Sequence, residues 1–288
     1  MGHRIDQAKT IGFLVAGALL CSVAHAQWLN YPTPGTPRTK DGKPNLSAKA
    51  PRASNGKPDL SGVWQTRLAP PGENERLFGS AVKDTSVPGD DPSTFSKYFI
   101  NILVDFKPEE APLRPEAAEL TRKHRASARD NPSSNCLPQS IPREDILSTR
   151  PFKIVQTPGL IVMLYELDGM HRQIYTDGRG LPVDPQPAWL GYSMGRWEGD
   201  TLVVDTAGFN DKSWLDGAGH PHSEELRIQE RFHRRDFGQM DLELTVDDPK
   251  MYTRPFTIKE TELLIPDSDI LEFVCNENER DLPHLPGR

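Results

Sequence analysis

The chain has 288 residues and a formal net charge of −7, and 36% of its residues are hydrophobic. This length suffices for one large domain, or for one domain with appendages. An acidic chain is a poor ligand for polyanions, so nucleic acid is not expected as a partner.

The first 26 residues have the features of a signal peptide. Arg4 and Lys9 precede an apolar run at residues 11–23, and residues 24–26 (AHA) fit an A-x-A cleavage site. The run is too short to span a bilayer comfortably, and no later stretch is long enough to do so. We therefore expect an exported protein, periplasmic or secreted, that has no membrane span once residues 1–26 are removed.

Residues 27–92 are expected to form an extended arm because they are rich in Pro, Gly, Asn and Lys. The arm contains a short internal echo, in which residues 41–47 (DGKPNLS) resemble residues 55–61 (NGKPDLS). Two copies are too few for a solenoid. The arm is expected either to wrap the domain or to stay mobile. The first strand is predicted near residues 62–66 (GVWQT).

Residues 93–135 are predicted to be a helical segment with two helices. The first is amphipathic, since apolar side chains recur at helical spacing along one face. They are Phe95, Tyr98, Phe99, Ile102, Leu103 and Phe106. The second helix is expected to begin at Pro115 and to run to about Ala128, because proline is favoured in the first turn.

Residues 136–288 are predicted to be an antiparallel β domain, because the apolar period changes to two. Consecutive hairpins without long helical crossovers favour an up-and-down, lipocalin-like barrel, and a β-sandwich is the alternative. The expected strands are Phe152–Gln156, Leu160–Glu166, His171–Thr176, Tyr192–Trp197, Thr201–Thr206, Leu226–Arg235, Gln239–Asp247, Phe256–Lys259 and Ile270–Cys275.

Two cysteines, Cys136 and Cys275, lie outside the signal peptide. In an oxidising compartment we expect them to form one disulfide, and two buried free thiols are the alternative. Their spacing excludes a CxxC-type metal or redox site.

Residues 191–195 (GYSMG) fit the G-x-S-x-G pattern of a serine-hydrolase nucleophile elbow. An elbow needs a strand, a sharp turn at the serine and then a helix. Here a hairpin turn at residues 198–200 leads instead into a β-branched run at residues 201–206. Ser193 is therefore expected to lie within a strand, where the glycines relieve crowding and Trp197 packs. A nucleophilic serine is the alternative.

Several longer motifs of the chain resemble those of a family of secreted bacterial proteins that is numerous in soil bacteria. The resemblance spans roughly residue 55 to the C-terminus. It implies export and a mostly β domain, and it carries over no catalytic residues. The motifs are residues 56–64 (GKPDLSGVW), 195–204 (GRWEGDTLVV), 219–224 (GHPHSE), 247–249 (DDP) and 275–278 (CNEN).

The loop at residues 217–225 contains two histidines in His-Pro-His order. In an extended chain His220 and His222 point the same way, about 6–7 Å apart, so both imidazoles could hold one divalent metal such as zinc. Glu277 is a candidate for the third ligand, as are the two glutamates that follow in the loop. Alternatively, the histidines cap the loop or bind carbonyl groups.

One charged residue lies on an apolar strand face. Glu230 shares its face with Ile228 and Phe232, and Arg172 shares a face with Ile174. A buried carboxylate must be paired, or its pKa rises. Either Arg172 and Glu230 form an ion pair that fixes the strand register, or they line a polar pocket. In the pocket hypothesis Glu230 is a general acid or base beside Arg172.

Further residues complete the candidate site. His222 could share the acid–base chemistry if its loop closes over the barrel mouth. Glu166, which ends an apolar run, and the aromatic residues Tyr192 and Trp197 are candidates for substrate binding.

Three functions are compatible with these features. The first is an exported enzyme, an acid–base hydrolase or lyase with or without a metal, that acts on a small molecule in a barrel mouth. The second is a non-catalytic barrel that binds a small ligand. The third is an envelope protein whose arm binds a partner.

Overall fold

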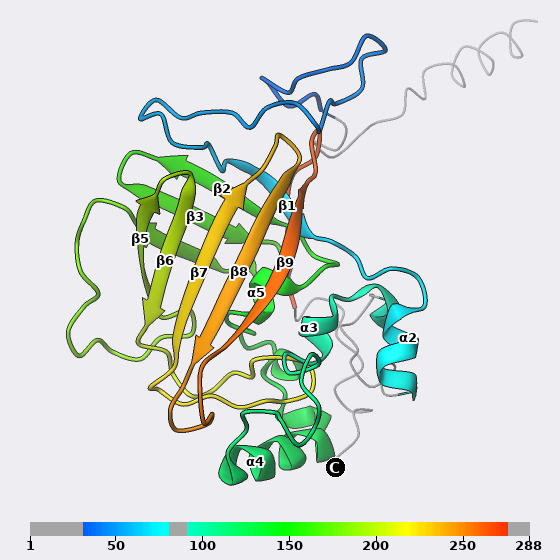
Figure 1. Ribbon diagram of the computed structural model, residues 1–288, viewed down its shortest axis with the longest axis vertical. Coiled ribbons are helices and arrows are strands. Elements are labelled where there is room, and N and C mark those ends of the chain that lie inside the picture. Colours follow the sequence, from blue (N-terminus) through cyan, green and yellow to red (C-terminus); the bar gives the residue numbers. More distant parts are fainter. Residues whose placement is uncertain (1–30, 81–90, 276–288) are drawn as a thin grey trace, which may run out of the picture.

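The computed structural model describes residues 31–80 and 91–275, so the expected signal peptide (1–26) and Glu277 lie outside the described residues. Nine strands in the described part form one closed barrel, in which each strand is hydrogen-bonded to the next and β9 returns to β1 (Figure 1). The mainly β, barrel-type fold is thereby confirmed, and the β-sandwich alternative is wrong.

Alternation of buried and exposed side chains accounts for most strand positions. Eight of the nine strands lie where the sequence pattern places them, to within one or two residues at each end. The strands are β1 Gly62–Thr66, β2 Phe152–Thr157, β3 Leu160–Tyr165, β4 His171–Tyr175, β5 Tyr192–Glu198, β6 Thr201–Ala207, β7 Arg227–Arg234, β8 Gln239–Asp247 and β9 Phe256–Leu264.

The end of the barrel differs from expectation. β9 runs five residues beyond Lys259, and the strand expected at Ile270–Cys275 is absent. The reason is closure: Leu264 of β9 pairs with Trp64 of β1, so the ring has no remaining edge for a further strand. The segment that follows is held otherwise, because the Leu271 N–H donates to the Glu166 carboxylate.

The wholly antiparallel topology is corrected at one place. Around a closed ring of purely antiparallel pairs the strand directions must alternate, and an odd number of strands cannot satisfy this. The mismatch falls between β4 and β5, which pair in parallel through Ile174↔Ser193 and Tyr175↔Met194. All other pairs are antiparallel, and this parallel contact is the shortest in the wall, with two paired positions against three for β1 with β2 and for β1 with β9.

The helices are inserted between β1 and β2, and there are more of them than the two expected. They gather at one end of the barrel and along the lower part of β9, with α5 on the inner side of the wall (Figure 1). The α-helices are α2 Glu73–Phe78, α3 Lys97–Ile100, α4 Pro115–Ala126 and α5 Arg143–Ile146.

The two predicted helices have different outcomes. α4 begins at Pro115 as expected and ends two residues before the predicted end. The amphipathic helix over residues 95–106 is wrong, because α3 covers only four residues. Asn101 is extended, and the Ile102 N–H donates to the Asp216 carboxylate, 2.7 Å away, in place of a helical carbonyl. The apolar face is nevertheless buried as its spacing indicates.

The echo in the arm is a structural repeat. Residues 37–47 and 51–61 form the same small loop twice, each closed by an isolated antiparallel bridge between its arginine and its second proline. The same backbone hydrogen bonds occur in both copies. Each turn has its glycine in the left-handed region, with φ 82° at Gly42 and 77° at Gly56, which explains why both copies retain glycine there.

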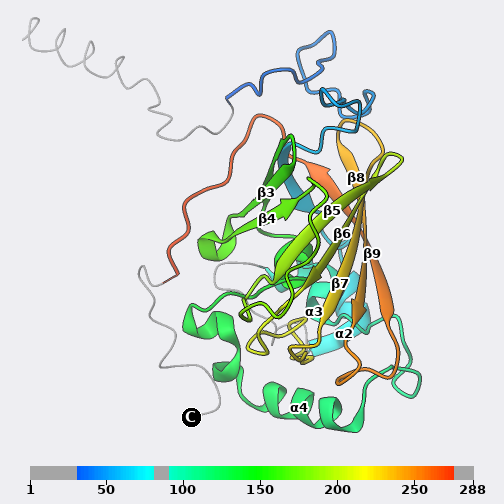
Figure 2. The same ribbon diagram turned by 90° about the vertical axis from the view of Figure 1, so that its left-hand side faces the viewer.

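Each repeat fastens the arm to the barrel through its arginine. Arg38 pairs with Asp267 and Arg52 pairs with Asp200, both at 2.6 Å. The arm lies across the end of the barrel opposite α4 in both views (Figures 1 and 2). Of the two expectations for the arm, wrapping applies to residues 33–61.

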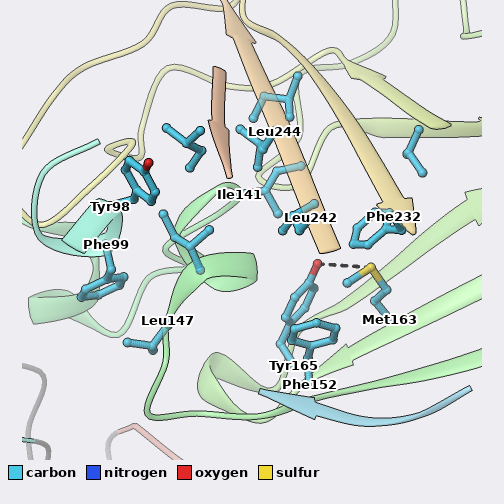
Figure 3. Packing of buried hydrophobic residues seen from close by; sticks show 14 of the residues in the cluster. Tyr98, Phe99, Ile141, Leu147, Phe152, Met163, Tyr165, Phe232, Leu242 and Leu244 are labelled. Atoms are coloured by element: carbon cyan, nitrogen blue, oxygen red, sulfur yellow. Dashed lines mark hydrogen bonds between the residues drawn. The ribbon is translucent and has the colours of Figure 1, made fainter. Parts of the chain in front are cut away.

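The barrel interior is filled by side chains. Phe152, Tyr165, Phe232 and Leu242 gather there, and Ile141, which precedes α5, packs into the same region (Figure 3). All four residues of α5 are buried. In the described part of the chain no helix is long and apolar enough to cross a membrane. The expected disulfide Cys136–Cys275 is present.

Candidate functional site

A buried polar cluster, here called the barrel cluster, centres on Arg172 and Glu230. β4 and β7 direct these side chains into the barrel, where they are 2% and 0% exposed. Arg172 donates through both terminal nitrogens to the two Glu230 oxygens. Its Nε–H donates to Ser193 (2.9 Å), and Nη2 also donates to Thr206 (2.8 Å). The predicted ion pair is therefore present, and the guanidinium is saturated with partners.

Asp145 of α5 adds a second carboxyl group to the barrel cluster. It lies 3.5 Å from Arg172 Nη1 and accepts a hydrogen bond of 2.7 Å from the Tyr165 hydroxyl. Burial, and then the nearby Glu230 carboxylate, raise the pKa of Asp145 above its ordinary value. Burial opposes the charge of Arg172, but Glu230 keeps the pKa of Arg172 above its usual range. The cluster thus holds one permanent cation between two acids.

The structure answers the G-x-S-x-G question. Ser193 lies inside β5, and its hydroxyl contacts Arg172 and Thr206, with no histidine among its hydrogen-bond partners. A Cβ on Gly195 would meet Thr176 and Ile174 side chains at 2.9–3.0 Å. Gly191 has φ +59°, and a Cβ there would lie 2.8 Å from a backbone oxygen. The glycines therefore serve packing, as expected, and Ser193 is a structural hydroxyl.

The two loop histidines have separate partners. His220 Nδ1 contacts the buried Asp216 carboxylate at 2.5 Å. His222 donates through Nδ1 to the Ser223 carbonyl and accepts at Nε2 from Ser213 (2.8 Å). Burial lowers the pKa of His222, which keeps it neutral. These contacts match the alternative in which the histidines tie their loop together.

A metal at this loop finds no support in the described part of the chain. No group of three or more His, Cys, Asp or Glu side chains there could hold an ion. The expected set of His220, His222 and Glu277 therefore lacks a third described ligand. Among the described residues, His222 is hydrogen-bonded to Ser213 and Ser223, whereas Arg172 and Glu230 are hydrogen-bonded to each other.

The expected substrate-binding residues are dispersed. Glu166 lies at the start of the 3₁₀ turn Leu167–Gly169 and binds the chain after β9. Trp197 packs partly buried against the core. Tyr192 is 36% exposed and lines a pocket beside β4. Tyr192 and Trp197 share β5, but of the three only Tyr192 lines the pocket that Arg172 and Ser193 of the barrel cluster also line.

An open pocket lies where β9 runs past the end of β1. β1 pairs only with residues 262–264 of β9, so the preceding residues of β9 have no strand beside them on that edge. The chain after β1 and the start of α3 lie against this edge and line the pocket. The pocket, here called the edge pocket, has a volume of about 550 Å³. Its lining includes Glu73, Ser96, Lys97, Tyr98 and Glu260.

Glu260 is the most perturbed acid of the edge pocket. Its side chain accepts a hydrogen bond from the Ser96 hydroxyl, and burial raises its pKa to about 7. Glu262, two residues on and fully buried, has a pKa raised well above its ordinary value by burial and then by Glu260. Burial opposes the charge of Lys97, yet its ion pair with Asp105 at 2.6 Å keeps its pKa raised. The edge pocket therefore holds a carboxyl group with a pKa of about 7, on Glu260, and a lysine that stays protonated, Lys97.

The sequence pattern contains a signal for Glu260 that the predicted strand boundary concealed. Phe256, Ile258, Glu260, Glu262 and Leu264 alternate on the inner face of β9. The same reasoning that identified Glu230 would have identified both glutamates. A strand that is predicted to end at Lys259 excludes Glu260 and Glu262 from its inner face.

A further acid pair anchors α5. The buried Glu144 carboxyl group has a pKa raised well above its ordinary value by burial and by its neighbour Asp168. Asp168 in turn accepts a hydrogen bond from the Gln139 N–H at 3.1 Å. Asp145 and Glu144 thus extend from one short helix into two polar clusters. The sequence pattern predicts neither of these two residues as part of a site.

No protein-family model matches the chain, and neither a curated protein nor a solved structure shows a match.

Proposed function

We propose that this chain is an exported enzyme that performs acid–base hydrolysis or elimination on a small polar molecule, and that Glu260 in the edge pocket is its general acid–base residue. The observation that carries the proposal is a half-buried glutamate with a pKa of about 7 in an open pocket. A pKa near the working pH allows one carboxyl group both to give and to take a proton efficiently. The disulfide and the resemblance to secreted proteins support export.

The surrounding side chains fit this role. The Ser96 hydroxyl donates to Glu260 and so orients its carboxyl group. Lys97 and Arg67 line the same pocket and supply positive charge that can stabilise a developing oxyanion. The Tyr98 pKa is raised to about 12 by burial and by Asp105, so Tyr98 is expected to bind and not to transfer protons.

The proposal relocates the chemistry that the sequence pattern assigned to Arg172 and Glu230. Both Glu230 oxygens bind Arg172, and neither residue is exposed, so this pair supports a structural role. Core side chains occupy the barrel interior, which favours a site on the wall beside β9 over the deep apolar cavity of a ligand carrier.

The test combines a substrate-independent measurement with an activity screen. The pKa of Glu260 is measured by ¹³C NMR on glutamate-labelled protein, with Glu260→Gln to assign its signal. A value below 5 would remove the basis of the proposal. Hydrolysis of p-nitrophenyl esters and glycosides is then followed from pH 5 to 9, with an expected loss of about 10²–10⁴-fold in Glu260→Gln.

The matched control is Glu243→Gln. Glu243 lines the same pocket, but it is exposed and pairs with Lys259 at 2.9 Å. The Glu243→Gln variant should leave turnover unchanged. Ser96→Ala removes a hydrogen bond that lowers the pKa of Glu260, so its pH profile should move to higher pH. Full activity in Glu260→Gln, with the fold intact by circular dichroism, would refute the assignment.

A further inference from the structure

A second pocket lies on the barrel wall at the parallel seam between β4 and β5. Figure 2 shows these two strands. This seam pocket has a volume of about 460 Å³ and shares no lining residue with the edge pocket. It exists because β4 begins at His171, whereas its pairing with β5 begins only at Ile174. Three residues of β4 therefore have no β5 partner, and the wall is open beside them.

The lining of the seam pocket offers flat aromatic surfaces. Tyr175 and Tyr192 contribute rings, and Leu190, Met194 and Pro182 add apolar contacts. The Tyr192 ring is held in place, since its hydroxyl donates to the Gln186 carbonyl at 3.0 Å. Gly191, which precedes it, has a left-handed backbone that a larger residue would strain. A planar ring is the ligand shape that such rigid aromatic walls favour.

The seam pocket is lined by two arginines, each of which is paired with a carboxylate. His171, Arg172 and Arg179 are among its lining residues, and no Asp or Glu is. Arg172 is neutralised by Glu230 inside the barrel. Arg179 is paired with Asp177 through Nε and Nη2, but this pair lies at the surface, and Nη1 stays outside its bonds. The guanidinium also lies 3.7 Å over the Tyr175 ring. Its guanidinium is thus fixed beside an aromatic wall.

The backbone of β4 adds hydrogen-bond donors that suit an anionic ligand. In a strand the amide groups of successive residues point alternately to the two sides. Of the three β4 residues without a β5 partner, at least one therefore directs its N–H and C=O toward the seam. Backbone N–H groups beside a fixed arginine are suited to a carboxylate.

We propose that the seam pocket is a binding site for a small aromatic carboxylate, with the ring against Tyr192 and the carboxylate toward Arg179, which Tyr175 supports from beneath. This site is separate from the proposed chemistry at Glu260, and either can exist without the other. It gives Tyr192 the ligand-binding role expected from the sequence, in a pocket that Arg172 and Ser193 of the barrel cluster also line.

The test uses 4-hydroxybenzoate as the probe for the full exported chain, with binding measured by saturation-transfer NMR and calorimetry. Two analogues separate the two interactions: 4-hydroxybenzyl alcohol keeps the ring without the charge, and cyclohexanecarboxylate keeps the charge without the aromatic ring. Both are expected to bind at least about fivefold more weakly, as the loss of one charge contact or one stacking contact implies.

The variants are chosen at the surface so that folding is preserved. Tyr192→Ala and Arg179→Gln are each expected to weaken binding by about tenfold, while the control Arg196→Gln leaves it unchanged. Arg196 is exposed on the same strand as Tyr192 but does not line the seam pocket.

Three results would overturn the proposal. They are no saturation transfer at millimolar probe, equal affinity for the charged and neutral rings, or wild-type affinity in both seam variants. Glu260→Gln should bind the probe like the wild type, so a failure at the edge pocket and a failure at the seam pocket are distinguishable.

Discussion

Glu230 and Glu260 are both glutamates that a strand directs into the barrel, yet their surroundings differ. Glu230 meets the guanidinium of Arg172 with both oxygens and is fully buried. Glu260 has the Ser96 hydroxyl as its side-chain partner, lies at the wall of an open pocket and has a pKa raised to about 7.

The difference shows that an inward carboxylate is not by itself a functional group. When a buried cation saturates it, the acid becomes part of the scaffold, since its charge is compensated and its oxygens are occupied. When only a hydroxyl contacts it, desolvation dominates and its protonation becomes responsive near neutral pH. What decides the outcome is the partner that the neighbouring strands supply.

The largest expected effect comes from removing that partner. Arg172→Met should destabilise the fold by about 3–5 kcal/mol, because Glu230 and Asp145 then remain buried without a cation. Urea unfolding monitored by tryptophan fluorescence measures the loss.

The matched double variant is Arg172→Met with Glu230→Leu. It should recover a large part of the stability, because an apolar pair of similar volume avoids the desolvation of both charges. Equal stability of the single and double variants would show that packing, and not the uncompensated charge, accounts for the effect.

The next largest effect is the contribution of Glu260 to the pH dependence of folding stability. Because the folded pKa of Glu260 is raised, its unfolded form ionises first, and stability is lost as pH rises from about 4.5 to about 7. Glu260→Gln cannot ionise, so it should lose about 2 kcal/mol less than the wild type across this range. Thermal unfolding at pH 5 and pH 8 makes the comparison.

The control for the pH effect is Glu243→Gln, which removes an exposed, paired carboxylate from the same pocket. It should retain the wild-type pH dependence. Identical slopes for Glu260→Gln and the wild type would contradict the raised pKa.

The smallest effect concerns the hydroxyl beside Arg172. Ser193→Ala removes one of the hydrogen bonds to the guanidinium and should cost about 1–2 kcal/mol, since the Nε–H is left buried without that acceptor. Any hydrolytic turnover should be unchanged. Complete loss of turnover with a folded protein would restore Ser193 as a nucleophile.

Much of the barrel is predictable because its signals are local. Period-two alternation marks β7 and β8, and proline marks the start of α4. The apolar residues at 95–106 show the limit of such signals. Their burial follows from their spacing, but their helix is interrupted because Asp216, far along the chain, captures the Ile102 N–H.

The candidate site is less predictable for the same reason. The alternation of β4 and β7 was sufficient to propose that Arg172 and Glu230 meet, because each inward charge needs a partner. Asp145 carries no such periodic signal, since it lies on a four-residue helix in an irregular segment. The separate partners of His220 and His222 also depend on residues that only the folded loop brings near.

By itself, the sequence determined the mainly β class, most strand positions, the pairing of the two cysteines and the inward charge at Glu230, because these depend on local periodicity and on composition. The tertiary structure alone decided the parallel seam, the end of the barrel at β9 and the pockets beside both. Ring closure with an odd number of strands is a property of the whole sheet, and a pocket forms where a strand lacks a neighbour. Neither condition is recorded in any one segment.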